Sequence, residues 1–140
     1  MMKILMLMLL MVSMNVSAEW TNIGGNLNDT KISYVDFETI RKKDNYAKIW
    51  SLIDFKTVTQ IKDVKFLTMI NHFEYDCNEE TVRQLDFYLY SGHMGSGEIV
   101  FSQINIKNEP QSMLPGSMNE DICWRRLKID HLEGFVPIEF

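Results

Sequence analysis

The strongest constraint on the fold is the alternation of apolar and polar residues between Lys65 and Cys77. Apolar side chains occupy most odd positions and polar side chains occupy most even positions. The odd set is Leu67, Met69, Phe73 and Tyr75, and the even set includes Thr68, His72, Glu74 and Asp76. A period of two is that of a β-strand with one face on the core and the other towards solvent. The pattern therefore predicts a strand that directs Cys77 into the core.

Similar alternation elsewhere, interrupted by turn residues, predicts a protein made mostly of antiparallel strands. Leu85, Phe87 and Leu89 alternate with polar residues after the turn at 78–80, as expected for a hairpin partner of the first strand. Further strands are expected at residues 20–23, 31–37, 46–59 and 98–106. In the last of these, the apolar parity changes after Phe101, which predicts a β-bulge.

The residues after Pro115-Gly116 break this pattern and predict a helix. Ser117 and Glu120 form a capping box, in which the hydroxyl and the carboxylate each satisfy an unpaired amide of the first turn. Asp121 and Arg125 are spaced as an ion pair. The apolar stripe of the helix is Met118, Ile122, Cys123 and Leu127. The expected fold class is α+β, with a single antiparallel β-sheet of about five to six strands and a C-terminal α-helix.

The first 18 residues predict export from the cytoplasm. Lys3 precedes nine apolar residues at 4–12, and Val16-Ser17-Ala18 offers a cleavage site. This is the pattern of a secretory signal peptide. The apolar run is shorter than the roughly 20 residues of a transmembrane helix, and no cysteine stands near the cleavage site to carry a lipid. We expect residues 1–18 to be removed and residues 19–140 to form one domain in the periplasm or at the cell surface, without a lipid anchor or transmembrane segment.

Cys77 and Cys123 are the only cysteines in the chain. An even number of cysteines in an exported protein predicts a disulfide rather than a metal site or a nucleophile. If Cys77 faces the core of the sheet and Cys123 the buried stripe of the helix, their disulfide fixes the helix to the sheet. Closing this loop would stabilise the fold by roughly 4 kcal/mol.

Charge argues against nucleic acid and anionic membrane surfaces as partners. The whole chain carries a net charge of −5, and removing Lys3 with the signal peptide leaves −6. An acidic protein without a basic stripe is repelled by polyanions. We select Lys56, Lys62 and Lys65, as the densest basic stretch, as the candidate partner-binding surface, although a solvated connection between strands would look the same.

No arrangement of residues predicts catalytic residues, a bound metal or a cofactor. His72, Glu74 and Asp76 alternate along one strand and could approach one divalent ion, but a solvent-facing strand explains them better. The glycine-rich segment 92–97 fits no phosphate-binding pattern, and Ser96 lacks the strand, turn and helix around a serine nucleophile. We expect this segment to be a hairpin turn.

Several motifs in a fixed order resemble the surface-adhesin protein E family. They are Tyr34-Val35-Asp36 with Ile40 four residues on, Ile49 to Phe55, Tyr75-Asp76-Cys77, Tyr90 to Glu98, and Pro115-Gly116-Ser117 leading to Cys123. The resemblance implies a small exported protein of a Gram-negative envelope, with the helix held to the concave face of the sheet by the disulfide. It also implies homodimers and non-enzymatic attachment to host extracellular-matrix or serum proteins. The alternative is a soluble periplasmic protein that acts as an inhibitor or small-ligand carrier.

The strand at 46–59 is apolar on both faces, with Trp50 and Leu52 on one side and Ile49, Ile53 and Phe55 on the other. A helix of about thirteen residues is roughly 20 Å long and cannot cover a sheet about 25 Å wide. We therefore predict a two-fold homodimer that uses the outer face of this strand or a neighbouring edge. The C-terminal tail is the alternative cover.

Overall fold

The computed structural model describes residues 18–123 and 127. The strands are β1 (Thr21–Gly25), β2 (Lys31–Lys43), β3 (Tyr46–Ile61), β4 (Val64–Asp76), β5 (Thr81–Tyr90), β6 (Ile99–Gln103) and β7 (Gln111–Ser112). A 3₁₀ turn, η1, spans His93–Gly95, and the helix α1 spans Met118–Ile122. The expected signal peptide, the pairing of Asp121 with Arg125 and the tail after Lys128 fall on residues outside this description. No helix among the described residues is both long and apolar enough to cross a membrane.

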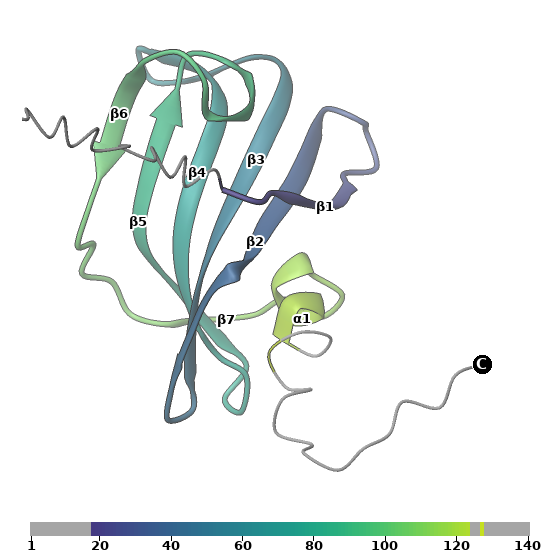
Figure 1. Cartoon of the computed structure of the whole chain (residues 1–140), viewed down its shortest axis with the longest axis vertical. Helices are drawn as coiled ribbons and strands as arrows, with labels where there is room; N and C mark the ends of the chain where they lie inside the picture. Colours follow the sequence, from purple (N-terminus) through teal and green to yellow (C-terminus); the bar gives the residue numbers. More distant parts are fainter. Residues whose placement is uncertain (1–17, 124–126, 128–140) are drawn as a thin grey trace, which may run out of the picture.

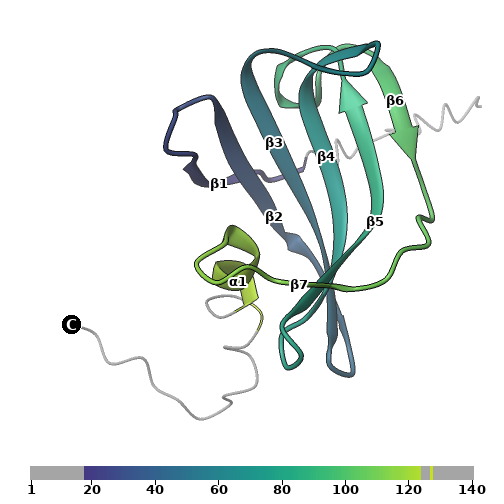
Figure 2. The same cartoon turned by 180° about the vertical axis from the view of Figure 1, so that it is seen from behind.

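The strands form one antiparallel sheet in the order β1-β2-β3-β4-β5-β6, and β7 pairs with the start of β5 (Figure 1). Each strand from β1 to β6 thus pairs with its neighbour in sequence. The sheet is twisted, and α1 lies against one of its faces near β2 (Figure 2). The predicted α+β class and the single antiparallel sheet are confirmed, with β7 as an additional short strand.

Two strands, β2 and β6, differ from the expected ones through irregular pairing, and β6 ends at Gln103 rather than at residue 106. The polar residues at 38–39 do not end β2: the pairing with β3 shifts between Asp36 and Arg41 and then continues to Lys43. The Asp36 carboxylate accepts a hydrogen bond from the Glu38 amide at 3.1 Å, which holds this bulge. In β6 the extra residue is Val100, since Ile99 pairs with Tyr90 and Phe101 with Leu89. The predicted bulge therefore lies before Phe101, not after it.

The main hydrophobic core lies between α1 and the sheet. Its buried members are Val35, Ala47, Ile49, Tyr75, Ile122, Cys123 and Leu127. The disulfide between Cys77 and Cys123, with their Cα atoms 5.5 Å apart, joins the end of β4 to the end of α1, as predicted. Three members of the predicted helical stripe are buried, whereas Met118 is exposed.

The opposite face of β3 and β4 is covered by the loop at 92–97. Ile49 and Leu52 lie on opposite faces of β3, yet both are 0% exposed. The loop lies on the side of Leu52, where the Met94 amide donates to the Asp54 carboxylate at 3.0 Å. Thr68 lies beneath this loop and is fully buried, so its predicted position facing solvent is wrong. The loop of the same chain therefore covers Leu52 on the outer face of β3, whereas Trp50 on that face is half-buried.

The cap of α1 gives a stability prediction. The Ser117 hydroxyl accepts a hydrogen bond from the Glu120 amide at 3.3 Å, as predicted, while the Glu120 carboxylate accepts from the Gly116 amide at 2.8 Å rather than from that of Ser117. Ser117→Ala should lower the free energy of unfolding by about 1 kcal/mol, because a first-turn amide loses its partner. Urea unfolding would measure this, with the exposed Ser102→Ala as control. Equal midpoints for the two variants would contradict the cap.

Candidate functional site

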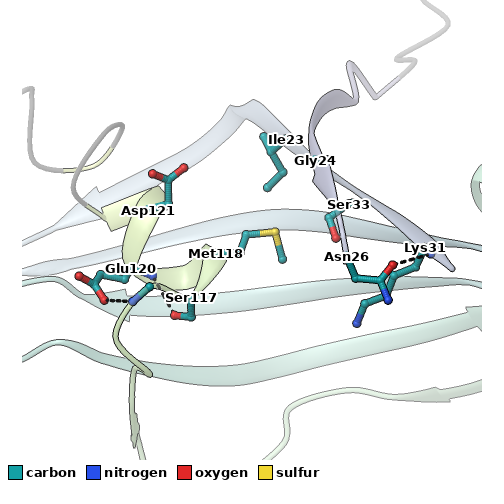
Figure 3. A pocket seen from close by; sticks show the side chains of 11 residues that line it. Ile23, Gly24, Asn26, Lys31, Ser33, Ser117, Met118, Glu120 and Asp121 are labelled. Atoms are coloured by element: carbon teal, nitrogen blue, oxygen red, sulfur yellow. Dashed lines mark hydrogen bonds between the residues drawn. The ribbon is translucent and has the colours of Figure 1, made fainter. Parts of the chain in front are cut away.

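A hollow of about 620 Å³ lies between β1, the start of β2 and α1 (Figure 3). Its lining residues are Ile23, Gly24, Gly25, Asn26, Lys31, Ser33, Gly116, Ser117, Met118, Glu120 and Asp121. Met118 extends from α1 into this space (Figure 3). The Asn26 carboxamide oxygen accepts from the amides of Thr30 and Lys31 at 2.9 and 3.3 Å, and the Glu120 carboxylate caps α1. These polar groups stabilise the walls of the hollow.

His72, Glu74 and Asp76 do not converge on one point. His72 Nδ1 lies 2.9 Å from the carboxylate of Asp86, and Glu74 accepts from Arg83 at 2.7 Å. Asp76 is buried and accepts from two backbone amides of the following turn, so its expected position facing solvent is wrong. Within residues 18–123 and 127, no group of three or more His, Cys, Asp or Glu side chains is placed to hold a metal ion.

The His72 ring links the carboxylate of Asp86 to an aromatic stack. It lies parallel to the Trp50 ring, with centroids 4.3 Å apart and an interplanar angle of 1°. Burial raises the pKa of Asp86, but hydrogen bonds from the Asn105 amide and from His72, with the charges of His72 and Lys48, lower that pKa below its ordinary value. The ionised carboxylate therefore stabilises the fold.

This pKa shift predicts a pH-dependent effect of Asp86→Asn. A carboxyl group with a lowered folded-state pKa contributes stability above its unfolded pKa, and this contribution is lost as the pH falls through the lower folded value. We expect the variant to unfold more easily than the wild type at pH 7, and the difference to shrink below the ordinary pKa of 3.8. Urea unfolding at pH 7 and at about pH 3 would measure it. A difference of the same size at both pH values would contradict this account.

Asp54, Thr68 and His93 meet beneath the 92–97 loop and bring an acid, a hydroxyl and an imidazole together. His93 Nδ1 is 3.2 Å and Thr68 Oγ1 is 3.3 Å from the same carboxylate oxygen of Asp54. In a catalytic triad the imidazole lies between the nucleophile and the acid, but here both groups contact the acid. Thr68 is fully buried and donates to a loop carbonyl at 2.5 Å. The cluster therefore holds the predicted glycine-rich turn on the sheet.

Lys56, Lys62 and Lys65 do not form one cluster. Lys62 and Lys65 lie at the tip of the β3–β4 hairpin, whereas Lys56 forms a 2.6 Å ion pair with Asp29 of the β1–β2 turn. Lys62 also borders an apolar hollow of about 240 Å³. The other lining residues are Ile61, Val64, Phe87, Leu89, Phe101 and Gln103. The structure therefore reduces this candidate surface to the hairpin tip.

Exposed apolar side chains follow β6 and the segment after it. They are Ile99, Val100, Phe101 and Ile104, which we call the β6 surface. Among the described strands, β6 lies at one end of the sheet order, and all of its residues are exposed. Exposed apolar area beside a strand edge is typical of surfaces where proteins associate.

Sequence reasoning overlooked a second basic cluster at the β2–β3 hairpin. Arg41, Lys43 and Lys48 are all exposed at this hairpin, and Arg41 pairs directly with Lys48 across the strands. Arg41, Lys42 and Lys43 are consecutive, so the choice of Lys56 to Lys65 as the densest basic stretch was wrong. That run of three was the signal in the sequence.

Comparison with known proteins agrees with this architecture. The model of the family "Surface-adhesin protein E" matches residues 20–125. One solved structure of Haemophilus influenzae protein E has a TM-score of 0.58 at 12% identity, covering 87% of this chain and 92% of that one. A structure of protein E from non-typeable Haemophilus influenzae has a TM-score of 0.53 at 13% identity, covering 79% and 76%. No match was found among curated proteins. The family match spans well over half of the chain, and the chain therefore belongs to the surface-adhesin protein E family.

Proposed function

We propose that this protein is exported to the cell envelope and acts there as an adhesin, which binds host extracellular-matrix or serum proteins without catalysis. The observation that carries the proposal is the family match over residues 20–125. The signal-peptide pattern of residues 1–18 supports export, and cleavage would leave residues 19–140 as the working domain. The Asp54, Thr68 and His93 cluster fits a structural role and not that of a catalytic triad.

The β3–β4 hairpin tip is the surface that we assign to the host protein. Val58 and Ile61 are 61% and 48% exposed there, beside the cations Lys62 and Lys65. Exposed apolar side chains with a polar rim are typical of the sites where proteins bind one another.

Capture of the mature protein by immobilised matrix and serum proteins would test this function. We expect binding to at least one of them, and weaker binding for the double variant Lys62→Gln with Lys65→Gln. Lys43→Gln with Lys48→Gln removes the same charge at the other hairpin and serves as the matched control. Wild-type protein that binds none of these proteins would contradict the proposal, and equal losses for both double variants would remove the hairpin tip from it.

Protease treatment of intact cells would separate the adhesin from the periplasmic alternative. An adhesin at the cell surface should be cleaved on intact cells. A periplasmic carrier should be protected until the outer membrane is opened. The apolar hollow beside Lys62 is the feature that favours a carrier, because it could hold the apolar part of a small ligand.

The homodimer is also part of the proposal. Because the 92–97 loop covers Leu52, we assign the predicted contact to a neighbouring edge, and β6 is the edge that carries exposed apolar side chains. Two copies could pair their β6 edges about a two-fold axis and cover Ile99 and Phe101. Sedimentation at micromolar concentration should give the mass of two chains for the wild type. The Phe101→Ser variant should give the mass of one chain. A wild-type monomer would remove the dimer from the proposal.

A further inference from the structure

The register of the sheet aligns four charged residues in one row across β2, β3, β4 and β5. Arg41 pairs with Lys48, Lys48 with Glu74, and Glu74 with Arg83. The row lies on the sheet face opposite α1, since Lys48 has the same parity as Trp50 while Ile49 belongs to the core beneath the helix. The adjacent Arg41 and Lys48 are like charges directly opposite each other, a pairing that destabilises a sheet.

Two acidic neighbours of the row are engaged elsewhere, although the charge of Asp86 also acts on Lys48. Glu74 is paired with Arg83 at 2.7 Å, and Asp76 accepts two backbone amides. Arg41 donates to two backbone carbonyls at 3.1 and 2.8 Å. These acceptors carry no net charge, so they do not balance the charge of the guanidinium group. In the described part of the chain, the side chains of Lys43 and Lys48 form neither a hydrogen bond nor an ion pair. A protein with a net charge of −5 therefore concentrates unpaired positive charge at one hairpin.

These cations surround a hollow of about 380 Å³. The lining residues are Arg41, Lys42, Lys43, Asp44, Tyr46, Lys48 and Glu74. Tyr46 is the only aromatic residue among them and is 48% exposed. The centres of protein–protein interfaces are poor in charged residues and rich in aromatic and apolar ones. A hollow lined almost wholly by charge fits instead a ligand whose own surface is charged.

We propose that this hollow binds a sulfated polysaccharide. Sulfate groups would contact Arg41, Lys43 and Lys48, and a sugar ring would lie on the exposed Tyr46 ring. An anionic ligand would reduce the repulsion between Arg41 and Lys48, neither of which forms an ion pair in the described part of the chain. This site is separate from the β3–β4 hairpin tip, and its existence does not depend on binding of host proteins there.

Calorimetric titration of the mature protein with heparin, a sulfated polysaccharide, would test the site, with uncharged dextran as the comparison. We expect heparin to bind, dextran not to bind, and the affinity for heparin to fall as salt is raised, because exposed charges are screened. Lys43→Gln with Lys48→Gln should bind heparin about tenfold more weakly. Lys62→Gln with Lys65→Gln removes the same net charge elsewhere and should bind within about twofold of the wild type.

Three outcomes would overturn the proposal. Wild-type protein that does not bind heparin at low salt excludes the site. Equal losses for the two double variants show that overall charge, and not this hollow, attracts the ligand. Poly-glutamate binding as tightly as heparin assigns the surface to acidic protein segments.

All four substituted side chains are exposed, and matching urea midpoints would show that the variants are folded. Host-protein capture should weaken in Lys62→Gln with Lys65→Gln, whereas heparin binding should weaken in Lys43→Gln with Lys48→Gln, so each proposal can fail alone.

Discussion

Cys123→Ser should lower the free energy of unfolding of the mature protein by roughly 2–5 kcal/mol. The disulfide closes a long loop, with a sequence separation of 46, and joins α1 to the end of β4. A helix as short as Met118–Ile122 is not stable by itself. Without the disulfide, α1 depends on the burial of Ile122 and Leu127 and on the Ser117 cap. Urea unfolding under oxidising conditions would measure the loss.

The partner cysteine supplies the control for this prediction. Cys77→Ser removes the same bond and should cost about as much as Cys123→Ser, and the double variant should cost little more than either one. Protein isolated from its native compartment should contain no free thiol. Two thiols that react with an alkylating reagent in that protein would contradict the disulfide.

Leu52→Ala should lower the free energy of unfolding by about 2–5 kcal/mol, because it leaves a cavity under the 92–97 loop. Leu52 is 0% exposed, and its cross-strand partner Ile70 lies against Gly95 of the loop. Leu114→Ala is the matched control, since Leu114 is 75% exposed and should change stability by less than about 0.5 kcal/mol. Urea unfolding of both variants would measure the difference.

The dependence of this loss on protein concentration identifies what covers Leu52. If the loop of the same chain is the cover, the loss should be the same at low and high protein concentration. If a second copy were the cover, stability would rise with concentration in the wild type more than in Leu52→Ala. Such a dependence would contradict the intrachain cover and would restore the outer face of β3 as the dimer contact.

Sequence patterns predicted those parts of the fold that depend on neighbouring residues. The alternation from Lys65 to Cys77 located β4 within one residue at each end, and the Ser117 cap located the start of α1. Sequence reasoning failed where a polar residue has a tertiary partner. Thr68 was expected at the surface because it is polar, but it is buried by hydrogen bonds with the loop. The polar residues at 38–39 were expected to end β2, but the strand continues beyond a bulge where the Thr39 hydroxyl accepts a hydrogen bond from the Trp50 amide of β3.

The sequence by itself determined the α+β class, the positions of the main strands along the chain, and the pairing of the only two cysteines. These features follow from side-chain periodicity, local capping and the cysteine count, which need no knowledge of distant contacts. Tertiary structure alone decided which residues share a surface. Contacts such as that of His93 with Asp54, 39 residues apart, cover the second face of β3. Sheet register sets Lys48 beside Arg41 and Glu74, because a shift of one residue would turn each side chain to the other face.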